Sequence, residues 1–214
     1  MKLITKILIT TFLIVLLIVG IGLYFYHGNP NNHIPSEQAF TYKNIKYKKL
    51  HKKGLLAKSF AEQHHLSTSY SFLIDMSEPS GKDRFYVYDT KKDSIAAFGL
   101  VAHGCGKEEF ARNPTFSNQP NSYCTALGRY RIGGKYKGQF GDAWKLKGLD
   151  SSNDKSFERN IVLHAYDCVP DVAPYPLPIC NSKGCPMVSY TFLKILKGYI
   201  EATDKPILLW IYKD

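Results

Sequence analysis

A cysteine beside a glycine and a histidine upstream of it are the residues of this chain whose types and spacing point most directly to chemistry. The cysteine is Cys185, which follows Gly184, and the histidine is His164, at the end of the apolar run 161–163. The thiolate is the nucleophilic form of cysteine, and a neighbouring imidazolium lowers the pKa of the thiol. The pair therefore predicts a nucleophilic site in which Cys185 attacks and His164 acts as its base.

The turn before the thiol is predicted to contribute to the same chemistry. Glycine adopts backbone conformations that other residues avoid, so Gly184 allows a sharp bend next to Cys185. A bend of this kind can point neighbouring amide groups at an acyl oxygen and so form an oxyanion hole. We expect Ser182 and Gly184 to shape this turn, and the amides around Gly184 and Cys185 to be the donors.

The surroundings of this pair resemble the L,D-transpeptidase catalytic domain (YkuD-like) family, whose pattern is a histidine, a loop, then Ser or Thr, His, Gly and Cys. Here 17 residues separate His164 from Ser182, which fits that pattern. Lys183 stands where most of the family has a second histidine. A divergent branch of the family reads Ser-x-Gly-Cys-Pro, and the run from Ser182 to Pro186 is similar to that branch.

Further segments agree with the branch, and the resemblance covers roughly residues 70–214. It implies a mainly β (α+β) fold, a small L,D-transpeptidase-like β-sandwich or barrel with a few helices and the cysteine at its mouth. The agreeing segments are Phe72 to Asp75, Val101 to Gly104, Phe116 to Asn118, Leu127 to Gly128 and Leu146 to Leu149.

The resemblance also implies an activity, that of a peptidoglycan L,D-transpeptidase. Cys185 is then expected to attack the carbonyl of the third residue of a tetrapeptide stem peptide, with His164 as the proton shuttle. An amine acceptor takes the acyl group from the thioester, so the partners are peptidoglycan stem peptides. No metal or cofactor is expected, and a carbapenem is the expected covalent inhibitor.

Other residues near these motifs have weaker assignments. His103, in Val-Ala-His-Gly, is a wall of the site or a structural residue, and the sequence leaves both open. Lys183 is expected to tune the electrostatics of the turn. Asn118 is a possible substrate contact, although a turn cap is the favoured interpretation. Members of the family orient this histidine through a backbone carbonyl. Asp167 is a possible orienting group for His164 in its place, but nothing else in the sequence supports it.

Other functions fit the sequence less well. Sortase-like enzymes have a more distant histidine and need a later arginine, whereas no arginine follows Arg159. Papain-like enzymes have the cysteine before the histidine. A non-catalytic wall-binding domain is disfavoured by the intact Cys–His pair. A carboxypeptidase or amidase, in which water replaces the amine, remains an alternative that the sequence does not separate from a transpeptidase.

The chain contains five cysteines. Outside the cytoplasm an odd number predicts two bridges and one free thiol, and four cysteines allow three pairings. Proximity in the sequence favours Cys168–Cys180 and Cys105–Cys124, which leaves Cys185 free. No Cys-x-x-Cys spacing occurs, so a zinc site is not expected.

The N-terminus reads as a membrane segment. Lys2 and Lys6 precede an uncharged, mostly apolar run over 7–26, and about 20 apolar residues span a bilayer as a helix. The positive charges predict a cytoplasmic N-terminus, with the remainder in the periplasm or cell envelope. We expect an uncleaved anchor in the inner (cytoplasmic) membrane rather than a cleaved signal peptide, which would make the protein secreted.

The rest of the chain divides into a tether over 27–49, a helical lead-in over 50–69 and a catalytic domain over 70–214. Short apolar or alternating runs between turn signals predict strands, and the class is therefore mainly β. The expected strands cover 70–76, 84–89, 94–102, 130–132, 143–149, 161–164 and 206–212, with helices over 50–66, interrupted early by Gly54, and over 189–201.

The charge of the chain is strongly positive. There are 28 Lys and Arg against 18 Asp and Glu, a formal charge of +10. A basic surface favours an anionic partner such as a membrane or an acidic cell-wall polymer, although a solvated lysine-rich surface fits equally well. The sequence carries no nucleic-acid recognition motif, so nucleic acid is not an expected partner.

Overall fold

The computed structural model describes residues 10–21, 36–104, 106 and 113–214, and side chains only outside 36–45. The chain forms two compact units, Met1–Tyr47 and Lys48–Asp214. Residues 10–21 are helical, and the remainder of the predicted anchor lies outside the described residues. No helix in the described ranges has the length and apolar character needed to cross a membrane.

Helix α2 runs from Ser36 to Gln63, which corrects two expectations. The predicted tether is helical from residue 36, because Lys, Glu, Ala and Gln favour helix even where no apolar stripe marks one. Gly54 does not interrupt the helix. A Cβ at Gly54 would come within 2.2 Å of the Tyr88 ring, so the glycine allows close packing of helix against sheet.

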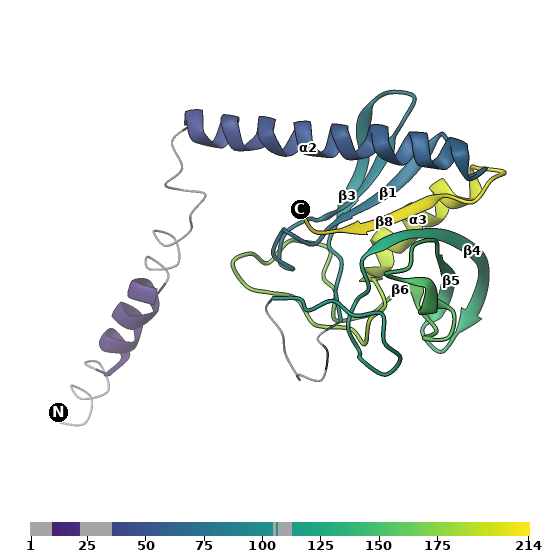
Figure 1. Cartoon of the computed structure of the whole chain (residues 1–214). Coiled ribbons are helices and arrows are strands. Elements are labelled where there is room, and N and C mark those ends of the chain that lie inside the picture. Colours follow the sequence, from purple (N-terminus) through teal and green to yellow (C-terminus); the bar gives the residue numbers. More distant parts are fainter. Residues whose placement is uncertain (1–9, 22–35, 105, 107–112) are drawn as a thin grey trace, which may run out of the picture. The chain divides into compact units, whose positions relative to one another are not determined.

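The second unit is built on a sheet of eight strands in the order β3-β2-β1-β8-β4-β5-β6-β7 (Figure 1). The last strand of the chain, β8, lies parallel to β1 and antiparallel to β4, in the middle of the sheet. Chain order and sheet order therefore differ. The strands are β1 (Tyr70–Asp75), β2 (Phe85–Asp89), β3 (Ser94–Gly99), β4 (Gly128–Gly138), β5 (Gly141–Gly148), β6 (Val162–Ala165), β7 (Met187–Val188) and β8 (Leu208–Tyr212).

Both faces of the central strands are buried. On β1, Phe72 and Ile74 belong to the larger core cluster, whereas Leu73 belongs to a second cluster on the other face. Helix α3 (Tyr190–Glu201) packs on the larger cluster through residues such as Leu196. Burial on both faces explains why these strands read as continuous apolar runs. The prediction of a mainly β protein with a few helices is confirmed.

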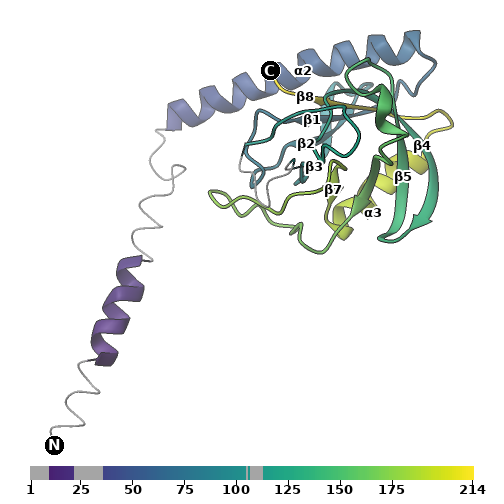
Figure 2. The same ribbon diagram turned by 60° about the horizontal axis from the view of Figure 1, so that its bottom comes forward.

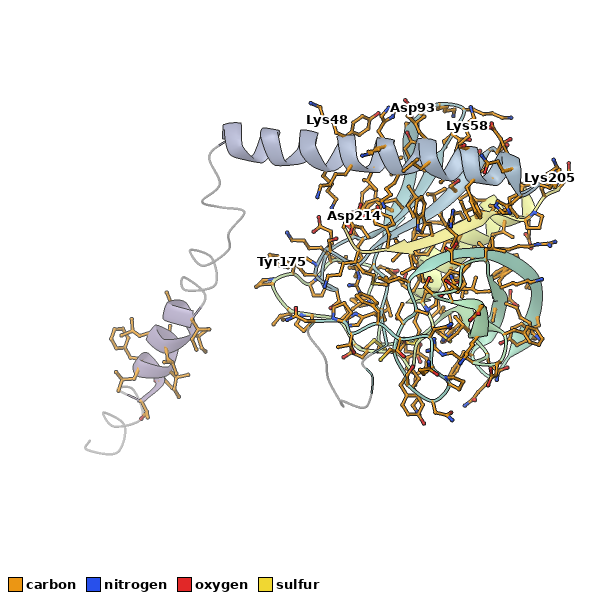
Figure 3. All side chains as sticks on the ribbon, in the orientation of Figure 1. Lys48, Lys58, Asp93, Tyr175, Lys205 and Asp214 are labelled. Atoms are coloured by element: carbon orange, nitrogen blue, oxygen red, sulfur yellow. A yellow bond between two sulfur atoms is a disulfide. The ribbon has the colours of Figure 1, made fainter. Side chains whose placement is uncertain are left out.

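Helix α2 covers the second cluster from Lys48 onward. Ala57 and Ala61 are fully buried in that cluster. Asp93, in the turn between β2 and β3, lies beside the helix (Figure 3), where its carboxylate is 2.8 Å from Nδ1 of His51. The helical lead-in is therefore packed onto the catalytic domain.

Strands β5, β6 and β7 position the predicted nucleophile and base. Ala143 on β5 is opposite His164 on β6, and His164 is opposite Met187 on β7. Figure 2 shows β7 where the chain enters α3, whose N-cap is Ser189, with Oγ 3.1 Å from Phe192 N. The predicted start of that helix is confirmed, whereas β7 is too short to leave a recognisable pattern in the sequence.

Candidate active site

Cys185 is partly buried and lies two residues before β7. Its Sγ is 3.8 Å from the carbonyl oxygen of Asn160. The preceding Gly184 has φ of +110°, a conformation that strains any residue with a side chain. A Cβ at Gly184 would also lie only 2.8 Å from the carbonyl oxygen of Cys124. The predicted glycine turn is therefore present, and its geometry requires glycine.

His164 lies on β6, the strand next to the one that follows Cys185. Its Nδ1 is 3.0 Å from the carbonyl oxygen of Ala165. A carbonyl only accepts hydrogen bonds, so Nδ1 carries the proton and Nε2 keeps its lone pair. The orienting group is thus a backbone carbonyl, as the family resemblance implied, and Asp167 is solvent-exposed.

An aromatic wall covers the imidazole. The ring of Phe140 stacks on the ring of His164 with a centroid distance of 4.9 Å, and Tyr166 meets Phe140 edge-on. Burial lowers the pKa of His164, against the opposing effect of the hydrogen bond to Ala165. The imidazole is therefore neutral at neutral pH and available as a base.

The thiol is perturbed in the opposite direction. Burial raises the pKa of Cys185, while the amide of Val162 and the charge of Arg159 partly oppose that effect. Burial thus disfavours both charged forms, and the resting thiol and imidazole are neutral. The expected lowering of the thiol pKa by an imidazolium stays a prediction.

Ser182 organises the turn from inside. Its amide donates to the carbonyl of His103 at 2.7 Å, and its Oγ accepts from the amide of Gly184 at 3.1 Å. The amide of Gly184 is thus engaged within the turn and not directed at a substrate, contrary to its expected role as an oxyanion donor. The amide of Cys185 remains as the candidate donor of the pair.

His103 is fully buried beneath that turn. Its Nδ1 lies 2.8 Å from Nη2 of Arg84, and its Nε2 lies 3.2 Å from Nδ2 of Asn181. Arg84, also fully buried, donates to the carbonyl of Val101 through both Nε and Nη2. Of the two interpretations left open by the sequence, this position favours a structural residue that supports the 181–184 segment.

Lys183 and Asn118, the other proposed substrate contacts, lie in different surroundings. Lys183 is exposed, with Nζ 5.6 Å from the centroid of the Tyr123 ring. Nδ2 of Asn118 donates to Oδ1 of Asp154 at 2.7 Å and to the carbonyl of Ser151 at 3.2 Å. Asn118 therefore braces two loops against each other, in line with its interpretation as a turn residue.

Arg159 lies next to the turn, although it was not among the predicted site residues. Its Nη1 donates to the carbonyl of Ser117 at 2.9 Å, and its Nη2 donates to the carbonyl of Cys124 and, at 3.4 Å, to Oγ of Ser122. Its place three residues before β6 and five before His164 was the only available signal. That spacing shows nothing about where a long side chain points.

The loop between base and nucleophile is closed by a disulfide. Cys168 and Cys180 are bonded, with their Cα atoms 6.0 Å apart, which confirms that predicted pairing. Tyr175 lies on the outer part of this loop (Figure 3). The pairing of Cys105 with Cys124 is not formed: Cys124 is a free thiol, and Cys105 lies outside the described residues.

Two hollows are lined by neighbours of the reacting residues, although neither Cys185 nor His164 is among their lining residues. One of about 240 Å³ includes Asn160 and Val162, which contact the thiol, together with Lys145 and Phe157. Another of about 360 Å³ is bordered by Phe140, the residue stacked on His164. A third of about 330 Å³ lies between the 76–81 turn and residues 175–178 and borders neither residue of the pair. Ligand space is thus present beside residues that contact the thiol and the imidazole.

Solved structures with similar folds include the helical cell shape determining protein Pgp2 from Campylobacter jejuni, with 14% identity, a TM-score of 0.46 and coverage of 68% of this chain and 48% of that one. An L,D-transpeptidase from Xylanimonas cellulosilytica matches with 15% identity, a TM-score of 0.39 and coverage of 67% and 60%. This chain spans about half the length of the first structures it matches. No curated protein sequence matches it significantly.

The family model of the L,D-transpeptidase catalytic domain matches residues 41–212. The match includes most of helix α2, all strands of the sheet and both Cys185 and His164. This chain belongs to the L,D-transpeptidase catalytic domain family.

Proposed function

We propose that this protein is a peptidoglycan L,D-transpeptidase that forms an acyl-enzyme through Cys185 and passes the acyl group to an amine. The observation that carries the proposal is a thiol on a positive-φ glycine turn, just before β7, and an imidazole on the neighbouring strand β6 whose Nδ1 is fixed by a carbonyl. Family membership supplies the substrate class. The activity itself, the acceptor and the site residues are part of the proposal.

In the first half-reaction, Nε2 of His164 takes the thiol proton as Sγ of Cys185 bonds to the carbonyl carbon of the third residue of a tetrapeptide stem. The electron pair of the carbonyl moves to its oxygen, which the amide of Cys185 stabilises. When the carbonyl re-forms, the bond to the terminal D-Ala breaks. The departing amine takes the proton from His164, and a thioester remains on Cys185.

In the second half-reaction, an amine attacks the thioester and gives its proton to His164. The thiolate leaves and recovers that proton, so the enzyme returns to its starting state. Water in place of the amine gives a carboxypeptidase or amidase, which remains the alternative. The apolar wall of Phe140 over His164 favours the amine, because it limits the access of water to the base.

The hollow lined by Asn160 and Val162 suits an anionic peptide. Lys145 lines it, with Nζ 5.1 Å from the centroid of the Phe157 ring. Stem peptides carry carboxylates, and a lysine over an aromatic ring offers them a cation next to an apolar surface. Carbapenems are proposed as covalent inhibitors, because their strained amide carbonyl presents the same target to Cys185.

The cellular position is also part of the proposal. We infer that residues 1–26 anchor the protein in the cytoplasmic membrane, with the catalytic domain in the periplasm or cell envelope. Only the sequence supports this anchor: Lys2 and Lys6 precede an apolar run, and positive charges at this end favour a cytoplasmic N-terminus. A reporter fused after Asp214 that is active only outside the cytoplasm is expected to be active; activity of a cytoplasmic reporter alone would contradict this topology.

Muropeptide analysis with purified protein tests the reaction. Incubation with tetrapeptide muropeptides is expected to give cross-linked dimers, with loss of one D-Ala per bond formed. Cys185→Ala is the matched control and is expected to leave the muropeptides unchanged. Tripeptide products without dimers would contradict transpeptidase activity and indicate a carboxypeptidase.

A further inference from the structure

The guanidinium of Arg159 is a cation whose hydrogen-bond acceptors are all uncharged. The acceptors are the carbonyls of Ser117 and Cys124 and the hydroxyl of Ser122. By contrast, Arg129 forms an ion pair with Asp150, and no ion pair of Arg159 occurs within the described part of the chain. Among the described residues, therefore, no carboxylate neutralises the positive charge of Arg159.

This cation lies against the catalytic turn. Nη2 of Arg159 is 3.1 Å from the place that a Cβ on Gly184 would occupy, so the guanidinium fills the space that the glycine leaves open. Its three acceptors belong to the 117–124 segment, and its own amide is fixed to the carbonyl of Lys155 at 2.9 Å. A planar guanidinium held by several acceptors has little freedom to move away.

We propose that Arg159 is a positioning residue that holds the 117–124 segment against the turn and stabilises the negative charge that forms on Cys185 when His164 takes its proton. The inference deepens the proposed function, because it rests on Cys185 being the nucleophile. Attack by a neutral thiol creates charge in a partly buried site, where a fixed cation stabilises it more than water-exposed charges can.

The other groups that face the thiol do not supply this charge. His164 becomes an imidazolium only during the reaction. Tyr130 interacts electrostatically with both Cys185 and Arg159, but burial raises its pKa above the ordinary value, so it stays a neutral phenol. Lys183 is adjacent in sequence, but it is exposed and lies over the Tyr123 ring. Burial raises the pKa of Cys185, and Arg159 is the cation that opposes this effect.

The test is the pH dependence of Cys185 alkylation by iodoacetamide in the full-length protein, followed by peptide mass analysis so that Cys124 does not contribute. Arg159→Gln removes the charge but keeps a donor, whereas Arg159→Lys keeps the charge. Arg131→Gln, on the exposed surface of β4, is the matched control for loss of one positive charge.

With Arg159→Gln, alkylation at neutral pH is expected to slow by roughly threefold to tenfold and its midpoint to move to higher pH, because less thiolate is present. Arg159→Lys and Arg131→Gln are expected to keep the wild-type profile. A purely structural Arg159 would instead lower the melting temperature in both Arg159 variants and leave the alkylation profile in place.

An unchanged profile for folded Arg159→Gln would overturn the inference, whatever the enzymatic activity. If that variant does not fold, a profile of Arg159→Lys shifted to higher pH would overturn it, and a wild-type profile together with a wild-type melting temperature would support it. If Arg159→Gln shifts the alkylation profile although the wild-type protein forms no acyl-enzyme, the inference about Arg159 is supported. In that case it is the proposed function that fails.

Discussion

At the scale of single residues, the site has a thiol just before β7 and an imidazole on the neighbouring strand β6, both uncharged at rest. Burial raises the pKa of Cys185 and lowers the pKa of His164, so the thiolate–imidazolium pair is disfavoured on both sides. The charges then form only as the thiol attacks. The reaction rate therefore depends on His164 being unprotonated rather than on a preformed thiolate.

This arrangement predicts the acid side of the pH profile. Acylation is expected to be lost only as the pH falls through the pKa of His164, which burial places below the ordinary value of 6.5. The measurement is the rate of acylation by a carbapenem as a function of pH. A rate that is already halved above 6.5 would show that His164 is readily protonated, contrary to this description.

The turn allows a second test at the residue scale. Gly184→Ala places a Cβ 2.8 Å from the Cys124 carbonyl at a φ of +110°, so we expect acylation to be abolished and the protein to lose about 1–3 kcal/mol of stability. Gly134→Ala, on β4, meets nothing within 4 Å and is the control. Thermal unfolding and acylation are measured together. Wild-type behaviour of Gly184→Ala would show that the glycine turn is dispensable.

The residue types in the sequence predicted the nucleophile and the base, but not the residues that hold the catalytic turn in place. Cys185, His164 and the glycine between a serine and the thiol were recognisable because the chemistry needs those types at that spacing. Arg159 and the buried contact of Arg84 with His103 were not, because they join segments far apart in the sequence. A long side chain reaches in a direction that only the folded backbone determines.

At the scale of elements, the loop from His164 to Cys185 is held at both ends. The disulfide Cys168–Cys180 closes it, and the turn that follows rests on the carbonyl of His103. Val169 and Ile179, each next to a bonded cysteine, pack in a small apolar cluster with Met187 of β7. Base and nucleophile are therefore kept in place by the loop that separates them.

Removal of this bridge is expected to weaken the site and the fold together. The double change Cys168→Ser and Cys180→Ser loses the constraint on a short loop, which is typically worth about 2–4 kcal/mol, and acylation should slow because the turn is less fixed. Cys124→Ala is the control, since it removes a free thiol but leaves the bridge and the Cys124 carbonyl next to Gly184 in place. Unaltered unfolding and acylation in the double variant would show that the bridge is unimportant.

Helix α2 offers a test in which helix propensity and packing oppose each other. Alanine favours a helix over glycine by roughly 1 kcal/mol, but a Cβ at Gly54 would lie 2.2 Å from the Tyr88 ring. We therefore expect Gly54→Ala to lower the melting temperature. Gly198→Ala in α3, with open space around it, is expected to raise it. Stabilisation by Gly54→Ala would mean that α2 is not packed on β2 as described.

At the scale of the whole molecule, the sheet order explains why the fold was only partly predictable. The apolar runs of β1, β2 and β8 were recognised close to their observed bounds, because burial on both faces leaves continuous apolar segments. Placement of β8 between β1 and β4 was not predictable, since pairing between distant segments leaves no mark in either one. The N-terminal half of α2 lacked an apolar stripe and was missed for that reason.

The central claim is that Cys185 is the acylated nucleophile and His164 its base. Mass spectrometry of the intact protein after exposure to a carbapenem tests it most directly, in wild type, Cys185→Ala, His164→Ala and Lys183→Ala. We expect a full adduct for the wild-type protein and a nearly full adduct for Lys183→Ala, because Lys183 is exposed. His164→Ala is expected to form the adduct slowly, and Cys185→Ala is expected to form none. An adduct on Cys185→Ala, or an unmodified wild-type protein, would contradict it.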